Sequence, residues 1–403
     1  MDAVTSPLRS LPLGAVLALA ACSGSTPAAE TPSSSSAPSP SAAESSTSTQ
    51  AQGPSECVSS VSEAMTPEQR AGQLLMVALT PQMGQDGLDA QLADGLGNML
   101  YLGGWEGRSR VAEASAHLQE GAPTVDGTTI GMLIAADQEG GEVQQLTGEG
   151  FSTIPSGVEQ GGLGSEELIA SALTWGNELG AAGVNVNLAP TADTVPEEIG
   201  KSNAPIGQYG RQYGSTPAAA GQGAASFAAG MHAAGVMPTA KHFPGIGRIT
   251  GNTDATAEGI TDEEASTDDP HLAPFATVIK AAPTLVMVGS ARYPQIDEAN
   301  QAPFSEAIVT DLLREQLGFD GVVITDDVGV AKAVADVPVA ERATRFLAAG
   351  GDIVLTADAT QTATMQGAIV DRAKGDEEFA GKVEDSLTRV LTLKESMGLL
   401  RCG

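Results

Sequence analysis

The chain has 403 residues, of which 50 are acidic and 20 are basic, so its formal net charge is −30. This charge argues against nucleic acid as a partner and against attraction to anionic lipids, because both recruit Lys and Arg. Only 3% of the residues are aromatic, which argues against a long groove paved with Trp and Tyr. We interpret the acidic residues as a strongly solvated surface.

The chain opens with an apolar run over residues 11–21. This run is shorter than the roughly 20 apolar residues that a membrane-spanning helix needs, and it is typical of a secretory signal peptide. It ends Leu19-Ala20-Ala21-Cys22, which resembles a bacterial lipobox and implies that Cys22 is lipidated. The alternative is an ordinary signal peptide with an incidental cysteine. We expect a signal peptide over residues 1–22 and a lipoprotein on the outer face of the cell membrane, or a secreted protein.

Residues 23–54 consist almost wholly of Ser, Thr, Ala, Pro and Glu. Such a segment buries too little apolar surface to fold, so we expect a disordered tether. Residues 55–403 suit one large domain. Cys57 and Cys402 lie near its two ends, and in an oxidising compartment they can pair. A disulfide between them is the preferred interpretation, and two free thiols are the alternative.

Eight short, continuously apolar runs recur through the domain, as in strands that are covered on both faces. They are Leu74–Thr80, Asn98–Gly103, Thr129–Asp137, Val184–Pro190, Val236–His242, Thr284–Ser290, Gly321–Asp327 and Asp352–Asp358.

Ala-rich stretches with helical spacing lie between these runs, and a further helix is expected over residues 376–400. The clearest are Leu168–Leu179, Pro217–Ala234, Leu272–Ala281, Glu306–Gln316 and Ala340–Ala349. Strands that alternate with helices indicate a parallel sheet, closed as a barrel or open and doubly wound. Eight repeats without a glycine-rich dinucleotide loop favour an α/β fold of the (β/α)8 TIM-barrel type.

Polar residues stand at or just beyond the carboxyl ends of several predicted strands. They are Asp137, Asp193, Lys241, His242, Asp326 and Asp327. In a barrel these positions converge on the face that carries the active site. Asp326 and Asp327 offer a carboxylate nucleophile for an anomeric carbon, although two acids here can equally cap the next helix.

The segment from Ala240 to Gly247 reads AKHFPGIG. It resembles the KHFPG motif of family 3 glycoside hydrolases, in their single-domain β-N-acetylhexosaminidase branch. Four further segments resemble the motifs of this family in the same order: Asp137-Gln138-Glu139-Gly140-Gly141, Asn187-Leu188-Ala189-Pro190 with Asp193, Arg211-Gln212-Tyr213-Gly214, and Phe304 through Asp327. Together they span most of residues 74 to 358.

The resemblance implies a role for each matching residue. Asp326 matches the nucleophile that forms a covalent glycosyl-enzyme. Asp137, Arg211, Lys241 and His242 match residues that hold the terminal sugar. The reaction implied is retaining hydrolysis, which also needs an acid/base group. No metal and no organic cofactor are implied.

The sequence departs from the family pattern at three positions. The family's acid/base is usually a His thirteen residues beyond the motif's Lys, where this chain has Asp254. We expect Asp254 to be the acid/base if its pKa is raised; the alternative is that it only orders its loop, for instance as an Asx turn. Glu258, Asp262, Glu263 and Glu264 are weaker substitutes. A family Arg is replaced by Gln145, and the second His of the motif is replaced by Ile246.

The sequence therefore predicts an exo-acting β-N-acetylhexosaminidase that removes terminal GlcNAc from muropeptides or chito-oligosaccharides. A β-glucosidase and a non-catalytic sugar-binding lipoprotein are the alternatives. The expected partner is a small carbohydrate. No nucleic acid partner is expected, the membrane is contacted only through an N-terminal lipid anchor, and the protein is expected to be a monomer.

Overall fold

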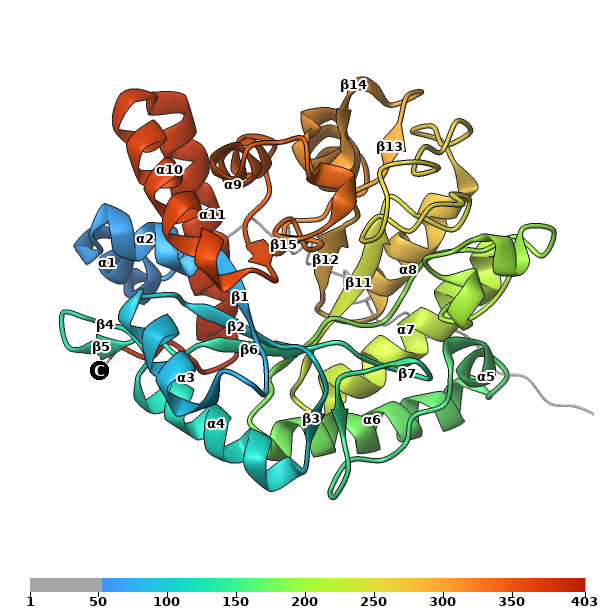
Figure 1. The fold of residues 1–403 in the computed structure, drawn as a ribbon, viewed down its shortest axis with the longest axis horizontal. Helices are drawn as coiled ribbons and strands as arrows, with labels where there is room; N and C mark the ends of the chain where they lie inside the picture. The colour runs from blue at the N-terminus through green and yellow to red at the C-terminus, as the bar shows by residue number, and fades with distance from the viewer. Residues whose placement is uncertain (1–52, 403) are drawn as a thin grey trace, which may run out of the picture. The chain divides into compact units, whose positions relative to one another are not determined.

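Eight parallel strands form a barrel in the computed structural model, which describes residues 53–402 (Figure 1). The two end strands of the sheet meet through a bridge between Ile324 and Ile353, where the N–H of Thr325 donates to the carbonyl of Ile353 at 3.0 Å. The barrel prediction is therefore confirmed. In order of pairing the strands are β15 (Val323–Thr325), β12 (Leu285–Val288), β11 (Met237–Phe243), β10 (Val186–Asn187), β6 (Leu133–Ala136), β2 (Asn98–Tyr101), β1 (Leu75–Leu79) and β16 (Val354–Thr356).

Every residue of these eight strands is buried. The strands are covered on both faces, by the barrel interior and by the helices, which is why their sequences are apolar runs without alternation. One predicted strand, Thr129–Asp137, began too early. Its first residue belongs to a small hairpin of β4 (Thr124–Val125) with β5 (Thr128–Thr129), and the barrel strand starts at Leu133.

Helices surround the barrel in Figure 1. They are α1 (Glu56–Ala64), α2 (Pro67–Gln73), α3 (Gly84–Ala93), α4 (Arg108–Glu120), α5 (Gly157–Gly161), α6 (Ser165–Ala181), α7 (Pro217–Ala233), α8 (Ala273–Ala281), the π-helix η5 (Ala307–Gln316), α9 (Val339–Ala348), α10 (Thr362–Gly375) and α11 (Glu377–Ser396).

The ends of these helices follow local sequence signals. Helix α7 begins where the side chain of Thr216 accepts the N–H of Ala219, and Pro217 fills its first position. Helix α11 begins where Asp376 accepts the N–H of Phe379. Such side-chain acceptors satisfy N–H groups that have no partner within the helix. The predicted helices therefore agree with the structure to within a few residues at each end.

The loops that connect the barrel strands and helices contain short additional strands and 3-10 turns. They are β3 (Trp105–Glu106) with β9 (Leu146–Thr147), β7 (Gln138–Gly140) with β8 (Val143–Gln144), β13 (Arg292–Tyr293) with β14 (Asp297–Gln301), and the 3-10 turns η1 (Gly200–Ser202), η2 (Gly207–Tyr209), η3 (Pro270–Leu272), η4 (Ala302–Phe304), η6 (Lys332–Val334) and η7 (Ala359–Gln361).

A disulfide joins Cys57 in α1 to Cys402 beyond α11, with 5.6 Å between the two Cα atoms. Two hydrogen bonds also connect α1 and its N-cap residue Ser55 to α11: the hydroxyl of Ser55 donates to Glu395 at 2.8 Å, and that of Ser62 donates to Glu384 at 2.5 Å. The predicted disulfide is confirmed, and it closes a loop that spans almost the whole domain.

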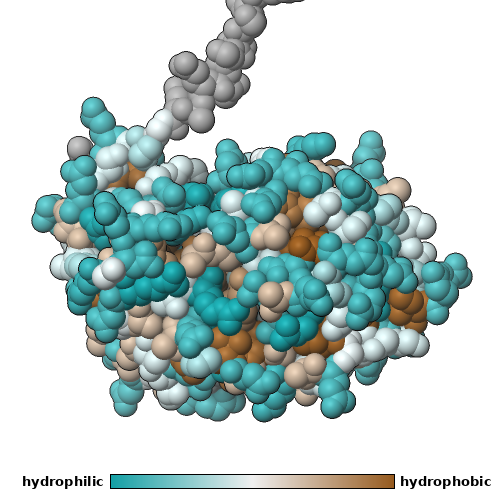
Figure 2. All heavy atoms as spheres, turned by 90° about the horizontal axis from the view of Figure 1, so that it is seen from above, coloured by the Kyte–Doolittle hydropathy of each residue, from teal (hydrophilic) through white to brown (hydrophobic). Residues whose placement is uncertain are grey.

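The face of the domain shown in Figure 2 is covered mainly by hydrophilic side chains, with small apolar areas between them. Within residues 53–402, no helix has the length and apolar content needed to cross a membrane. The predictions for the signal peptide, for Cys22 and for nearly all of the tether concern residues 1–52, which lie outside the described residues.

Candidate active site

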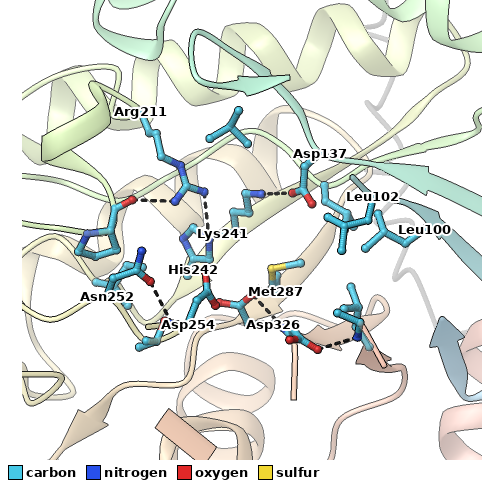
Figure 3. A pocket seen from close by; sticks show the side chains of 18 of the residues that line it. Leu100, Leu102, Asp137, Arg211, Lys241, His242, Asn252, Asp254, Met287 and Asp326 are labelled. Carbon is cyan, nitrogen blue, oxygen red and sulfur yellow. Dashed lines mark hydrogen bonds and ion pairs between the residues drawn. The ribbon is translucent and has the colours of Figure 1, made fainter. Parts of the chain in front are cut away.

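A cavity of about 380 Å³ lies at the carboxyl ends of the barrel strands. Its wall is built from residues at or just beyond the ends of seven of the strands, together with the loops after β10 and β11. It includes all six residues that were predicted to act on a sugar, which Figure 3 labels: Asp137, Arg211, Lys241, His242, Asp254 and Asp326.

One side of the cavity holds a network of opposite charges. The ammonium of Lys241 lies 2.5 Å from Asp137 and 2.7 Å from Glu139. The guanidinium of Arg211 binds both oxygens of Glu139, at 2.7 and 2.9 Å. Its remaining nitrogen donates to the carbonyl of Pro205 at 2.8 Å. Both cations are thus fixed in position by carboxylates.

The charges of this network shift the pKa values of its members. Burial of Glu139 tends to raise the pKa of its carboxyl, but the adjacent Arg211 and Lys241 outweigh burial and lower it to about 2. Burial of Lys241 tends to lower its pKa, and the carboxylates of Asp137 and Glu139 raise it above the usual value. Glu139 and Lys241 are therefore both charged at neutral pH.

His242 is held in one orientation by Asp193, which is fully buried. One oxygen of Asp193 lies 2.8 Å from Nδ1 of His242, and the other accepts the N–H of Ile246 at 2.8 Å. The loop that follows packs tightly, because a Cβ on Gly247 would lie 1.8 Å from the carbonyl oxygen of Thr194. A glycine is therefore required in the stretch that follows Lys241 and His242.

Asp137 is positioned from the neighbouring strand. The side chain of Asn187 in β10 accepts the N–H of Gln138 at 3.0 Å and donates to the carbonyl of Gln138 at 3.1 Å. This pair of hydrogen bonds replaces the strand ladder at the point where β6 ends, so the backbone beside Asp137 is held at the rim of the cavity.

The two adjacent acids after β15 have different surroundings. Asp327 accepts the N–H groups of Gly329, Ala357 and Val330 at 2.8, 2.7 and 3.0 Å. Asp326 accepts only the N–H of Asp327, at 2.9 Å through Oδ1, among the contacts of the described residues. Asp327 is thus engaged in holding the loop, whereas Oδ2 of Asp326 is left for the cavity. Asp326, which the family resemblance matches to the nucleophile, is therefore the one of the two adjacent acids that is left for the cavity.

Asp254 lies on the loop after β11, and Figure 3 shows its side chain and that of Asp326 pointing toward each other. Burial of the carboxyl and then the charge of Asp326 raise the pKa of Asp254 to about 6. The residue as a whole is exposed. Asp254 therefore lies at the mouth of the cavity and not in the core. The Asx turn of this loop is formed by Asn252, whose side chain accepts the N–H of Asp254 at 3.0 Å. The carboxyl of Asp254 accepts no hydrogen bond from the described residues.

The weaker substitutes for the acid/base lie elsewhere. Asp262 is buried, pairs with Arg248 at 2.8 Å and accepts two backbone N–H groups. Asp262, Glu263 and Glu264 line a different cavity, and Glu258 does not line the one described above. His117, His232 and His271 are likewise absent from its wall.

The two other departures from the family pattern also lie in this wall. The side-chain oxygen of Gln145 accepts the N–H groups of Gly103 and Gly104 at 3.0 and 3.3 Å, so this residue contributes a neutral amide. Ile246 is buried and adds an apolar surface beside His242.

The sequence interpretation missed Glu139, which joins Lys241 to Arg211. It stands two residues after Asp137, and alternate residues of an extended segment face the same side. That spacing could have indicated its position. Within the described residues, no group of three or more His, Cys, Asp or Glu side chains is arranged to hold a metal ion.

Comparison with known proteins places this geometry in a family. Residues 66–393 match the family model described as the glycosyl hydrolase family 3 N terminal domain. The chain belongs to glycosyl hydrolase family 3. It is therefore a glycosidase, as the sequence motifs predicted, and the family resemblance is confirmed.

Several members of family 3 are similar over most of the domain. A beta-hexosaminidase of Stenotrophomonas maltophilia is 32% identical over 268 residues, which are 64% of this chain and 75% of the relative. The crystal structure of a β-N-acetylhexosaminidase from Beutenbergia cavernae is 43% identical with a TM-score of 0.79, covering 82% of this chain and 99% of the other. A family 3 β-N-acetylglucosaminidase from Paenibacillus is 28% identical with a TM-score of 0.73, covering 83% of this chain and 63% of the other.

Proposed function

We propose that this family 3 glycosidase is an exo-acting β-N-acetylhexosaminidase that removes terminal β-linked N-acetylglucosamine. The observation that carries the proposal is the arrangement of one cavity: Asp137, Lys241, Arg211 and His242 present polar groups on one side, and Asp254 faces Asp326 on the other. The names of the similar hexosaminidases support an N-acetylhexosamine, and that of the Paenibacillus β-N-acetylglucosaminidase supports N-acetylglucosamine. The substrate classes compatible with this activity are muropeptides and chito-oligosaccharides.

The sugar is held by polar groups rather than by stacking. None of the described residues that line the cavity is Phe, Tyr or Trp. Hydrogen bonds from fixed groups to sugar hydroxyls discriminate strongly, because an analogue without the hydroxyl leaves a buried polar group unpaired. A small cavity with fixed polar groups suits recognition of a chain end, which favours exo action.

The reaction we propose retains the anomeric configuration and has two steps. In the first step Oδ2 of Asp326 attacks the anomeric carbon, the bond from that carbon to the leaving oxygen breaks, and this oxygen takes the proton of Asp254. In the second step the carboxylate of Asp254 takes a proton from water. The water oxygen attacks the anomeric carbon, and the bond to Asp326 breaks to release the sugar.

Asp254 suits the acid/base role because its two protonation states are both accessible. A carboxylic acid with a pKa of about 6 is partly protonated near neutral pH and can donate and then accept a proton, as general catalysis requires. Its carboxyl is not occupied by the loop, whose Asx turn is made by Asn252.

The experiment that tests this function uses residues 55–403 and two chromogenic substrates, the aryl β-N-acetylglucosaminide and the aryl β-glucoside. An aryl leaving group needs little protonation, so turnover reports the nucleophile and the sugar. We expect turnover of the N-acetylglucosaminide and its loss in Asp326→Asn. Preferential turnover of the glucoside would support a β-glucosidase instead. Binding of N-acetylglucosamine without any turnover would support a sugar-binding protein.

We also propose that the enzyme is exported as a monomeric lipoprotein attached through Cys22. The lipobox-like segment before Cys22 and the disulfide between Cys57 and Cys402 both suit an oxidising compartment outside the cytoplasm. Labelling of cells with a fatty acid analogue should mark the wild-type protein and not Cys22→Ala. Equal labelling of the two would contradict lipidation at this residue.

A further inference from the structure

The cavity wall carries more carboxylates than Lys and Arg side chains. Asp254, Asp326 and Asp327 lie together on one side of it. Burial and the charges of Asp326 and Asp327 raise the pKa of Asp254, and they outweigh His242 and Arg211, which act to lower it. A leaving group that sits against this side meets a negative potential.

The two cations of the cavity are already paired. Arg211 is bound at both ends of its fork by Glu139 and Pro205, and Lys241 is bound by Asp137 and Glu139. Both side chains are mostly buried, with 14% of Arg211 and 2% of Lys241 exposed. Their charge is largely compensated by these carboxylates, so little of it is left to attract a carboxylate on the substrate, although each side chain keeps N–H groups for sugar hydroxyls.

The remaining lining includes uncharged side chains. Gln145 presents an amide whose oxygen is occupied by the N–H groups of Gly103 and Gly104. Leu100, Leu102 and Val143 lie in the same wall. Among the charged side chains of the described lining, Asp137, Asp254, Asp326 and Asp327 therefore outnumber Arg211 and Lys241.

From this distribution of charge we propose that the enzyme selects a leaving group that is neutral or positively charged, as in chito-oligosaccharides and their partly deacetylated forms. It discriminates against a leaving sugar that bears a carboxylate, as the muramic acid residue of a muropeptide does. This inference rests on the proposed hexosaminidase activity and decides between its two substrate classes. Its physical basis is that juxtaposed like charges disfavour the wrong partner.

One exposed cation lies near the mouth of the cavity. The backbone N–H of Lys332 donates to the carbonyl of Asp254 at 3.2 Å, and its side chain is exposed and does not line the cavity. An exposed ammonium is well hydrated and screened by salt, so we expect it to contribute little to selection.

The test compares disaccharides that share a terminal β-1,4-linked N-acetylglucosamine. Their second sugars are N-acetylglucosamine, glucosamine, N-acetylmuramic acid and the methyl ester of N-acetylmuramic acid. We expect kcat/KM for the first two to exceed that for the muramic acid by about tenfold or more. The methyl ester, which keeps the bulk and removes the charge, should recover most of the difference. Raising the salt concentration should increase kcat/KM for the acid and leave the neutral disaccharide unchanged.

Two results would overturn the selection by charge. One is a kcat/KM for the muramic acid equal to or above that for the neutral disaccharide. The other is a methyl ester as poor as the acid, which would assign the discrimination to bulk. Lys332→Ala serves as the matched variant, because it keeps the backbone hydrogen bond to Asp254. We expect the ratio of kcat/KM for the neutral disaccharide to kcat/KM for the muramic acid disaccharide to be the same in this variant as in the wild type. A change of this ratio in Lys332→Ala would contradict control by the cavity wall.

Calorimetry on the wild type with sulfur-linked analogues of the four disaccharides, which are not hydrolysed, separates this inference from the proposed activity. The enzyme need not turn over any substrate to rank their affinities, and all three acids of the cavity wall stay in place. Weaker binding of the acid than of its methyl ester would support the selection even if the wild type proved inactive on the aryl β-N-acetylglucosaminide. Equal binding of the two would contradict it even if that substrate were hydrolysed.

Discussion

The backbone N–H of Ala333 donates a hydrogen bond to the carbonyl oxygen of Thr253 at 2.9 Å, which joins the loop after β15 to the loop after β11. Asp326 begins the first loop and Asp254 lies on the second. The two acids that we propose to carry out the reaction are therefore linked through the backbone, although 72 residues separate them in the chain (326 − 254 = 72).

The loop that carries Asp254 is closed at its base by Arg248, which pairs with Asp262 at 2.8 Å and also with Asp269. We expect Arg248→Met to lower the free energy of unfolding by about 3 kcal/mol, because it leaves buried carboxylates without a partner. Turnover of substrates with poor leaving groups should fall about tenfold, since the acid is no longer held in place. Denaturant unfolding and kinetics with two leaving groups check this. An equal loss of turnover for substrates with poor and with good leaving groups would show that Arg248 does not act through Asp254.

Asp254→Asn tests the acid/base. With a sugar leaving group, kcat/KM should fall by about 10²- to 10⁴-fold, whereas an activated aryl leaving group should lose much less. The first step needs protonated Asp254, so wild-type kcat/KM for the sugar substrate should decline as pH rises through about 6. The variant should lack this decline. A decline that persists unchanged in Asp254→Asn would assign the proton to another group.

Asp327→Asn distinguishes the two adjacent acids. Asp327 accepts three backbone N–H groups, and an Asn amide can satisfy only part of them. We expect a loss of about 1–3 kcal/mol in the free energy of unfolding, with turnover reduced by less than about tenfold. The corresponding Asp326→Asn variant should fold as well as the wild type and lose about 10³-fold or more in kcat. The reverse pattern would exchange the roles of the two acids.

Lys394 in α11 is fully buried, and its ammonium donates to the side chain of Gln73 at 2.6 Å and to the carbonyl of Gly97 at 2.9 Å. Burial lowers the pKa of Lys394 to about 7. Between this pH and the unfolded pKa of about 10.4, the unfolded chain binds one proton more than the folded chain. The free energy of unfolding should therefore rise with pH over this range. Lys394→Met should lose this dependence, as urea unfolding at several pH values can show; an identical slope in the variant would refute the assignment.

The disulfide between Cys57 and Cys402 closes a loop with a sequence separation of 345 residues. A covalent link over so long a loop restricts the unfolded chain, and its removal should cost about 2–5 kcal/mol. We expect a double Cys57→Ala and Cys402→Ala variant to unfold at lower denaturant concentration. Reductant should lower the denaturant concentration at which the wild type unfolds toward that of the variant, and it should not change this concentration for the variant. A wild type that does not respond to reductant after denaturation would argue against the bond.

The barrel could be predicted because its strands are covered on both faces, so each is an uninterrupted apolar run in the sequence. The residues at the strand ends could be predicted to converge because all the strands of a parallel barrel end on one face. The start of β6 was placed too early because Thr129 and Ile130 are as β-prone as the strand itself. Their pairing with the preceding hairpin, and at Ile130 with Leu400, depends on distant contacts.

The parts of the site that escaped prediction also depend on contacts between distant residues. Glu139 binds Arg211, which is 72 residues away, and Lys241. The family resemblance assigned the nucleophile to Asp326, but the contacts that occupy Asp327 follow from where Gly329 and Ala357 place their N–H groups. Motif spacing alone carries neither relationship. The catalytic and sugar-binding roles of the individual residues stay predictions until variants are measured.

The central claim is that Asp326 is the nucleophile of a retaining N-acetylglucosaminidase. The test uses an activated N-acetylglucosaminyl fluoride that carries a second fluorine at C5. The second fluorine slows both steps of the reaction, so that a covalent glycosyl-enzyme accumulates. Intact mass spectrometry can detect this intermediate. The wild type should gain the mass of one fluorinated sugar, located to the peptide that contains Asp326, and Asp326→Asn should gain none. An adduct on another carboxylate, or release of fluoride without any adduct under the same conditions, would contradict the account.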